Sequence, residues 1–434
     1  MINDIIKILN LEDFIIDIDS TSLIKENNVF YLSIKLTKLP SYVCENCGNV
    51  CFRIHDYVKK TINHGLFSDN KLVICYYARR IRCKACGKRF YEHNPFSNKN
   101  ENMSFYTIHK ILDTLRDFHI TFTHVADKYY LSKNQVLMIF DQYVNCTRNL
   151  LPEVLCVDEF YKGKKSKQKY AFVMLDFQTS QIIDVLPTRK KDYLLQYFSL
   201  IPKKERQKVK FICMDMYDQY KIVAKYRFPN AKIAVDSFHV IKHINDALIA
   251  LRIKIMNKFD KKTNSLEAND IYYYMLKKFH YFFVKDFDQI YDGYIKIPKL
   301  KTKWKKQEIL AYLLSIDETL RKAYFLKEQY RDLNRNAEQN EWSLNQLHQI
   351  INKFTNFGFE KFHEVGNMMR RWENEIFNSF IRIGGRRLSN GPIEGTNSRI
   401  KTILKNACGY KKFKRLRNRI MFSLNNNEPI KYTK

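Results

Sequence analysis

The 434-residue chain is too long for one small domain, and its hydrophobic share of 45% is enough to form packed cores, which excludes global disorder. Lys and Arg outnumber Asp and Glu by 75 to 45, and the formal net charge of +30 favours a polyanionic partner, for which we expect nucleic acid. The sequence contains no run of about 18 apolar residues that would predict a membrane-spanning helix. The N-terminus lacks the basic start of a signal peptide, so we expect a cytoplasmic protein with no membrane partner.

Cysteine spacing predicts a metal site in residues 1–97, which also hold an alternating strand pattern at 28–37. Four of the ten cysteines form two CxxC pairs, each followed by glycine: Cys44, Cys47, Cys83 and Cys86. Two such knuckles joined by a β-hairpin supply the four soft ligands of one structural Zn²⁺, and a domain with so thin a core needs the metal for stability. Cys51, Cys75 or His55 remain alternatives for one ligand position.

Helical periodicity follows in residues 98–150 and predicts three helices between 104 and 144. A break at Leu131 precedes Ser132, which can cap the last helix. This pattern is typical of a helix-turn-helix DNA-binding domain, although any three-helix module would produce it. The recognition helix would present its first residues to base edges in the major groove: Lys133, Asn134 and Gln135. The apolar positions of the same helix are expected to face the core: Val136, Ile139, Phe140 and Tyr143.

Short apolar runs from residue 153 onward predict buried strands. These runs are EVLCVDEF, YAFVMLDF, QIIDVLP, VKFICMD and AKIAVDSF, with helical stretches near 190–200 and 217–227 between the later ones. The order fits a ribonuclease H-like α/β core that begins in residues 151–239, although pattern alone does not establish topology. Residues 240–383 are rich in helix formers and predict an all-α insertion, whose aromatic stretch at 271–287 we assign to helix core rather than to base stacking. We therefore expect a multidomain α+β protein.

Two acids end neighbouring apolar runs. Asp158 ends VLCVD and Asp215 ends VKFICMD, so both can converge at one edge of an open α/β sheet. A third carboxylate from elsewhere would complete a cage for Mg²⁺, which prefers oxygen ligands. Two such ions, roughly 3.5–4 Å apart, can activate the attacking oxygen and stabilise the leaving oxygen in phosphoryl transfer.

Glu394 is the candidate for that third carboxylate. It is the single acid between Arg386 and Arg419, a segment that contains eleven Lys or Arg. Asn390 or Gly391 could cap a helix that would hold Glu394 in its first turn, where the helix dipole favours the ionised form. The alternative is an acid that only begins a helix.

The order of these features resembles the bacterial insertion-sequence L-three family of DDE transposases over nearly the whole chain. The motifs that carry the resemblance are CVDEF, CMDMYDQY, FPNAKIAVDSFHVIKH and SNGPIEGTNSRIKTILKNACGYKKFKRLRNRI. The resemblance implies that Asp158, Asp215 and Glu394 are catalytic and hold two Mg²⁺ or Mn²⁺ ions, and that residues 384–434 complete the core after the insertion.

The DSFH stretch resembles an Asp/Cys-x-x-His motif of transposases with helical insertions. On this basis His239 is a further catalytic candidate near the scissile phosphate. The alternative is a helix start capped by Asp236, with His239 as a packed side chain. Glu159 and Asp218 lie beside the matched acids and are expected to support them or to lie at the surface.

The resemblance also implies an activity and its partners. The enzyme would bind the terminal inverted repeats of an insertion sequence, cleave a strand and join it to target double-stranded DNA, as a homo-oligomer of at least two chains in the bacterial nucleoid. Basic residues expected to contact phosphates are Arg386, Arg387, Arg399, Lys401, Lys411, Lys412, Lys414, Arg415, Arg417 and Arg419, although about half could form an ordinary solvated face. A non-catalytic zinc and helix-turn-helix regulator derived from a transposase, or a structure-specific nuclease, remain alternatives.

Overall fold

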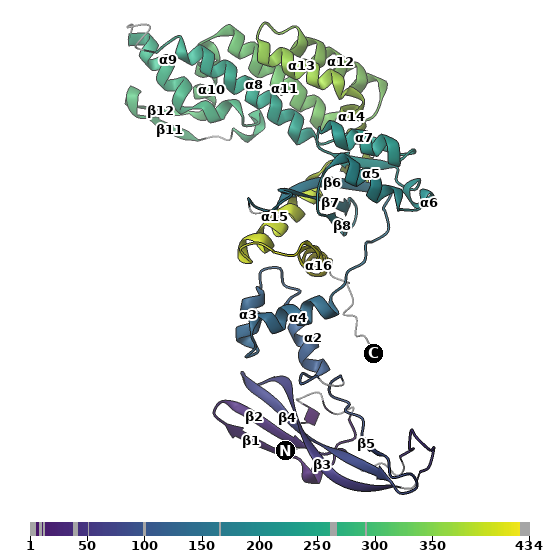
Figure 1. Ribbon diagram of the computed structural model, residues 1–434. Helices are drawn as coiled ribbons and strands as arrows, with labels where there is room; N and C mark the ends of the chain where they lie inside the picture. Colours follow the sequence, from purple (N-terminus) through teal and green to yellow (C-terminus); the bar gives the residue numbers. More distant parts are fainter. Residues whose placement is uncertain are drawn as a thin grey trace. The chain divides into compact units, whose positions relative to one another are not determined.

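The computed structural model describes residues 6–7, 11, 14–37, 42–50, 52–98, 101–164, 166–260, 267–290 and 293–425. These residues form two compact units. The terminal unit comprises the described residues of Met1–Thr147 and Arg399–Lys434, and the central unit comprises those of Arg148–Ser398. Figure 1 shows the helices and strands of both units and labels many of them.

A five-stranded sheet begins the terminal unit, with strand order β1-β2-β4-β3 and β5 paired to β4. The strands are β1 Ser22–Glu26, β2 Val29–Ile34, β3 Phe52–Phe67, β4 Asn70–Cys83 and β5 Arg89–Tyr91. The strand predicted from the alternation at 28–37 is confirmed as β2. Ser68 and Asp69 join β3 to β4 with positive φ values of 47° and 60°, as in a tight two-residue hairpin turn.

Three helices follow the sheet in the same unit: α2 Phe105–Thr114, α3 Phe122–Lys128 and α4 Lys133–Tyr143. Ser132 caps α4 in a capping box with Gln135, which confirms the predicted helix start. The four apolar positions predicted to face the core of this unit are buried: Val136, Ile139, Phe140 and Tyr143.

The C-terminal helix α16, Phe413–Leu424, packs on these three helices within the terminal unit. The Phe140 and Phe422 rings lie 6.0 Å apart, and Asn418 Nδ2 donates to the Val144 carbonyl. The sequence-based division instead placed all of residues 384–434 with the catalytic core. The predicted division and the structural units differ because the sequence of an amphipathic helix shows which of its faces is apolar, but not which segment packs against that face.

The central unit is built on a second five-stranded sheet, with strand order β10-β9-β6-β7-β8. Its strands are β6 Val154–Tyr161, β7 Tyr170–Asp176, β8 Ile182–Leu186, β9 Phe211–Met214 and β10 Lys232–Val235. β6, β7 and β8 are antiparallel neighbours, whereas β9 and β10 are parallel to β6. The predicted strands and the helices α5 Lys191–Ser199 and α7 Asp218–Arg227 are therefore confirmed, and a short helix α6 Lys203–Arg206 lies between them.

Helices dominate the rest of the central unit. They are α8 Ser237–Asn257, α9 Glu267–Lys278, α10 Lys306–Ser315, α11 Glu318–Asn336, α12 Glu341–Thr355, α13 Glu360–Arg371 and α14 Glu373–Asn378. α8 begins before the predicted boundary at residue 240, because Asp236 caps it directly after β10. The aromatic residues Phe279, Phe282 and Phe283 are at most 1% exposed, which confirms their assignment to the helical core.

The prediction of an all-α insertion is wrong in one respect, because the insertion contains a β-hairpin. Strand β11 Tyr294–Ile297 pairs antiparallel with β12 Thr302–Lys305. The sequence gives little indication of these strands, since lysine is depleted in strands and Pro298 interrupts the run. A second, two-residue pair of β13 Arg382–Ile383 and β14 Arg386–Arg387 lies just before the last acidic motif.

Helix α15, Gly391–Asn406, begins within the central unit and ends within the terminal unit. Within the described residues, no helix is both long and apolar enough to cross a membrane.

Candidate active site and metal-binding cluster

Four thiols gather where β3 begins and β4 ends. The Sγ atoms of Cys44 and Cys86 are 3.6 Å apart, those of Cys47 and Cys83 are 3.7 Å apart, and all four lie within 4.8 Å of one another. A tetrahedral zinc with Zn–S bonds of about 2.3 Å has S···S edges of about 3.8 Å. The cluster therefore has the size of a zinc site, and the four cysteines predicted from spacing are the four that the structure brings together.

The two knuckles share one backbone design. Cys44 N–H donates to the Asn49 carbonyl, and Cys83 N–H donates to the Lys88 carbonyl. Gly48 and Gly87 have φ values of +66° and +73°, a left-handed conformation that favours glycine and explains why glycine follows each CxxC.

Thiolate formation is favoured at one position of the cluster. A backbone hydrogen bond at Lys88 lowers the pKa of the Cys86 thiol to about 6, and the thiolate is the form that binds metal. Of the alternative ligands, Cys75 is buried within β4 and His55 is an exposed residue of β3, and neither belongs to the cluster. Cys51 lies outside the described residues.

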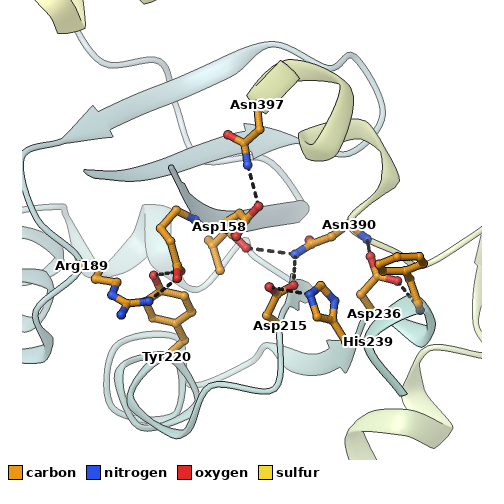
Figure 2. Close-up of polar contacts among 11 residues, drawn as sticks. Asp158, Arg189, Asp215, Tyr220, Asp236, His239, Asn390 and Asn397 are labelled. Carbon is orange, nitrogen blue, oxygen red and sulfur yellow. Dashed lines mark hydrogen bonds and ion pairs between the residues drawn. The ribbon is translucent and has the colours of Figure 1, made fainter. Parts of the chain in front are cut away.

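A second constellation forms at one edge of the central sheet (Figure 2). Asp158 lies on β6 and Asp215 directly follows β9, and these parallel strands are paired with Cys156 opposite Cys213. Because each aspartate follows its paired cysteine by two residues, both carboxylates reach the same edge of the sheet.

Two asparagines tie these acids to the segment around Glu394. Asn390 Nδ2 donates to the Val157 carbonyl at 3.1 Å and to Asp215 Oδ1 at 3.3 Å. Asn397 Nδ2, on α15, donates to Asp158 Oδ2 at 2.6 Å. The sequence predicts Asn390 only as a possible helix cap, whereas its side chain points to the acids.

Glu394 lies in the first turn of α15, as its position predicts, and its side chain is exposed. Burial raises the pKa of Asp158 to about 7, and the negative charges of Asp215 and Glu394 contribute to this shift. Burial also raises the pKa of Asp215, although His239 and Asn390 act in the opposite direction. Partial burial and the charge of Asp236 raise the pKa of Glu394. Three carboxylates therefore lie where their ionised forms are disfavoured unless a cation offsets their charge.

His239 and Asp236 have different positions at this edge. His239 Nε2 lies 3.1 Å from Asp215 Oδ2, so the histidine contacts one of the candidate acids. Asp236 is 4% exposed, caps α8 through the Phe238 N–H and accepts the Asn390 N–H at 3.0 Å. Asp236 thus connects the helix start to the loop before α15, and His239 is the member of the pair that approaches the acids.

Glu159 is held beside Asp158, whose Oδ1 accepts the Glu159 backbone N–H at 2.7 Å. The Glu159 carboxylate accepts hydrogen bonds from Arg189 and, at 2.5 Å, from the Tyr220 hydroxyl (Figure 2). Asp218 begins α7, and its side chain is largely exposed. Of the two acids beside the matched positions, Glu159 is therefore held next to the site and Asp218 lies at the surface.

The donor set fits a hard divalent cation. The side-chain oxygens of Asn390 and Asn397 are buried beside the acids without a hydrogen-bond partner in the described part of the chain, and Mg²⁺ prefers such oxygen ligands. Among the described residues only the thiol cluster gathers three or more metal-ligating side chains within 4.8 Å, so the three carboxylates do not close around one point. Such a spread is compatible with ligands distributed over two ions.

Several basic residues predicted to contact phosphate are instead held within the fold. Arg419 is 1% exposed and donates to the carbonyls of Asp117 and Ile120. Arg417 Nη1 donates to the Cys146 carbonyl at 2.7 Å, and Arg415 forms a two-pronged pair with Asp141. The sequence does not reveal these contacts, and it therefore presents the three arginines as part of one basic cluster.

Near the third acid, Arg387 donates to the Ser379 carbonyl and hydroxyl, and burial lowers its pKa to about 10. Arg386 is exposed, although its guanidinium donates to the carbonyls of Phe177 and Gln178. The remaining basic candidates have exposed side chains: Arg399, Lys401, Lys411, Lys412 and Lys414.

The start of α4 presents Lys133, Asn134 and Gln135 to solvent. Gln135 Oε1 accepts from the Ser132 N–H at 2.8 Å, so the amide oxygen of this residue is engaged in the helix cap. The side chains of Lys133 and Asn134 take no part in this helix cap.

Reasoning from sequence missed four residues of this site. Asn390 and Asn397 flank Glu394 in the quoted motif, and their spacing from that acid was an available signal. Arg189 and Tyr220, which hold Glu159, follow no pattern that spacing reveals.

Residues 155–420, more than half of the chain, match the family model of insertion-sequence L-three DDE transposases, whose description is Transposase. The chain is also similar to the transposase for insertion sequence element IS1001 of Bordetella parapertussis, with 22% identity over 223 residues. That alignment covers 50% of this chain and 53% of the relative, so the chain spans about half the length of the curated relative it matches.

Proposed function

The chain belongs to the insertion-sequence L-three family of transposases, and from that premise we propose that it cleaves DNA at the ends of a bacterial insertion sequence and joins them to target DNA. The observation that carries the proposal is the meeting of Asp158 and Asp215 at one sheet edge, tied through Asn397 and Asn390 to the helix of Glu394. The catalytic type we propose is DDE, with these three acids as the catalytic residues.

The core that bears the acids would be of the ribonuclease H type. Its support is the strand order β8-β7-β6-β9-β10, with three antiparallel strands followed by two parallel ones, and Asp158 on the central strand β6. The long helical insertion would then separate the third acid from the first two along the chain.

Asp158, Asp215 and Glu394 would hold two Mg²⁺ or Mn²⁺ ions, which supply activation of the attacking oxygen and stabilisation of the leaving oxygen in phosphoryl transfer. Asn397 would orient the Asp158 carboxylate, and Asn390 would orient that of Asp215. His239, whose Nε2 lies 3.1 Å from Asp215 Oδ2, would either fix this acid or contact the scissile phosphate.

DNA recognition would lie in the terminal unit. One structural Zn²⁺ on the four thiols would hold the ends of β3 and β4, and α4 would act as the recognition helix of a helix-turn-helix, presenting Lys133 and Asn134 to base edges. Phosphate contacts would come from the exposed side chains of Arg386, Arg399, Lys401, Lys411, Lys412 and Lys414. The enzyme would act in the bacterial cytoplasm as at least a dimer, because joining both ends of an element to target DNA requires that the two ends be held together.

The test is strand cleavage and joining on labelled DNA that carries the element's own ends, with Mg²⁺, with Mn²⁺ and with chelator. We expect wild-type protein to nick and join, and Glu394→Gln to bind the ends without cutting. Glu341→Gln is the matched control, since Glu341 is also an exposed acid in the first turn of a helix. Specific binding by wild type without cleavage under any metal would instead identify a regulator, and cleavage without joining would identify a nuclease.

A further inference from the structure

The hairpin β11–β12 has two chemically different faces. Ile295 lies opposite Trp304, and both side chains pack on the hydrophobic core of the insertion, as does the fully buried Ile297. Because alternate residues of a strand point to opposite sides, Lys296 and Lys303 project from the other face. The core contacts therefore fix which side of the hairpin is presented to solvent.

That outer face is strongly basic. Lys296 lies directly opposite Lys303, Lys305 lies opposite Tyr294, and all four side chains are exposed. Residues 294–306 contain six Lys and no Asp or Glu. Lys301 adds a further exposed charge at the turn, where its φ of 55° is unusual for a residue with a side chain.

The charges on this face are uncompensated within the described part of the chain. Of the six lysine side chains, that of Lys299 alone has an acidic partner there, Asp270 at 3.3 Å, and the Glu308 carboxylate accepts the backbone N–H of Lys305. Like charges directly across an antiparallel pair destabilise it, so the facing Lys296 and Lys303 oppose the folding of the hairpin. The buried apolar face offsets this cost, but that face does not require lysine on the opposite side.

We propose that the outer face of β11–β12 is a docking surface for the phosphate backbone of double-stranded DNA, centred on Lys296, Lys301 and Lys303. Lysine binds phosphate as a point charge without reading the base, so this surface would add affinity and not sequence specificity. A two-stranded ribbon also has a width that the major groove accepts. The proposal rests on the proposed function, since it assigns a further contact with the same DNA partner.

The test compares two triple variants of the full-length chain. Lys296→Gln, Lys301→Gln and Lys303→Gln together neutralise the outer face. The matched control neutralises three exposed lysines of the same helical insertion that already have polar partners: Lys322 with Glu318, Lys353 with Gln329 and Lys361 with Glu364. Binding to a duplex of arbitrary sequence is measured across a salt series, and thermal unfolding is recorded for each protein.

If three phosphate contacts are lost, the slope of log affinity against log salt becomes less steep by about 2–3, while the control keeps the wild-type slope. The hairpin variant should unfold at the same or a higher temperature than wild type, because it removes a like-charge pair. An unchanged slope, or an equal change in the control, would overturn the proposal and leave an acidic protein surface as the partner to test. Absence of duplex binding by wild type would overturn the proposed function as well, so the two failures are distinguishable.

Discussion

Replacement of Arg419 by methionine should destabilise the terminal unit, although the residue reads as part of a DNA-binding cluster. Its guanidinium donates to the Asp117 carbonyl at 2.9 Å, the Ile120 carbonyl at 2.7 Å and the Ser423 hydroxyl at 2.6 Å. Methionine keeps the unbranched stem but leaves the two carbonyls without this donor. At about 1 kcal/mol net for each of three hydrogen bonds, the local stability should fall by about 3 kcal/mol.

Hydrogen exchange measured by peptide can localise this loss. A decrease of about 3 kcal/mol corresponds to exchange roughly a hundredfold faster in peptides from α2–α4 and α16. The three tryptophans, Trp304, Trp342 and Trp372, all lie in the central unit, so their fluorescence should be unchanged and serves as an internal control.

Lys414 provides the converse control, because it lies on the same helix with an exposed side chain. Lys414→Gln should weaken DNA binding at low salt and leave exchange in α2–α4 at the wild-type rate. If Arg419→Met instead weakened DNA binding without accelerating exchange, Arg419 would contact phosphate and the argument from its burial would be refuted.

Three further predictions concern the acids and the thiols. Asp158→Asn should stabilise the metal-free protein in chelator by up to about 4 kcal/mol at pH 8 but by only about 1.5 kcal/mol at pH 5, because the folded wild-type carboxyl, with a pKa of about 7, is ionised at the higher pH and protonated at the lower one. An equal effect on unfolding at both pH values would contradict this. Asn397→Ala should slow cleavage by about 10–100-fold and raise the Mg²⁺ concentration that cleavage requires, since it removes the 2.6 Å hydrogen bond to Asp158. An unchanged Mg²⁺ titration curve would count against the orienting role of Asn397. Cys47→Ser should lower bound zinc, measured by elemental analysis, from one per chain to a substoichiometric amount. Cys75→Ser, at a buried cysteine outside the cluster, should retain the zinc, and equal zinc in both variants would exclude the cluster as the site.

Much of the local structure could be predicted from the sequence. Both CxxC knuckles, the start of α4 at Ser132 and the succession of strands and helices along the first part of the central unit depend on neighbouring residues, spacing and apolar periodicity. Such signals are short-range, because turns, caps and buried strands are specified by residues close together in the chain. The position of Asp215 directly after β9 followed from the same reasoning, whereas Asp158, which ends the predicted apolar run, lies within β6 because that strand continues to Tyr161.

Long-range packing decided the remaining features. The basic run of α16 divides into buried Arg419, paired Arg415 and exposed Lys414 only because the helix packs on α2–α4, more than 250 residues earlier in the chain. Likewise, the burial of Trp304 and its neighbours determines which lysines of β11–β12 face outward, and the fold brings Asn397 to Asp158.

The sequence by itself therefore determined which chemical groups the protein has: four thiols at metal-binding spacing, three separated acids and a large excess of positive charge. The tertiary structure decided which of these groups meet, which are buried and which remain available to a partner. The physical reason is that charge and ligand type belong to each residue alone, whereas burial and hydrogen bonding depend on segments that folding brings together from distant parts of the chain.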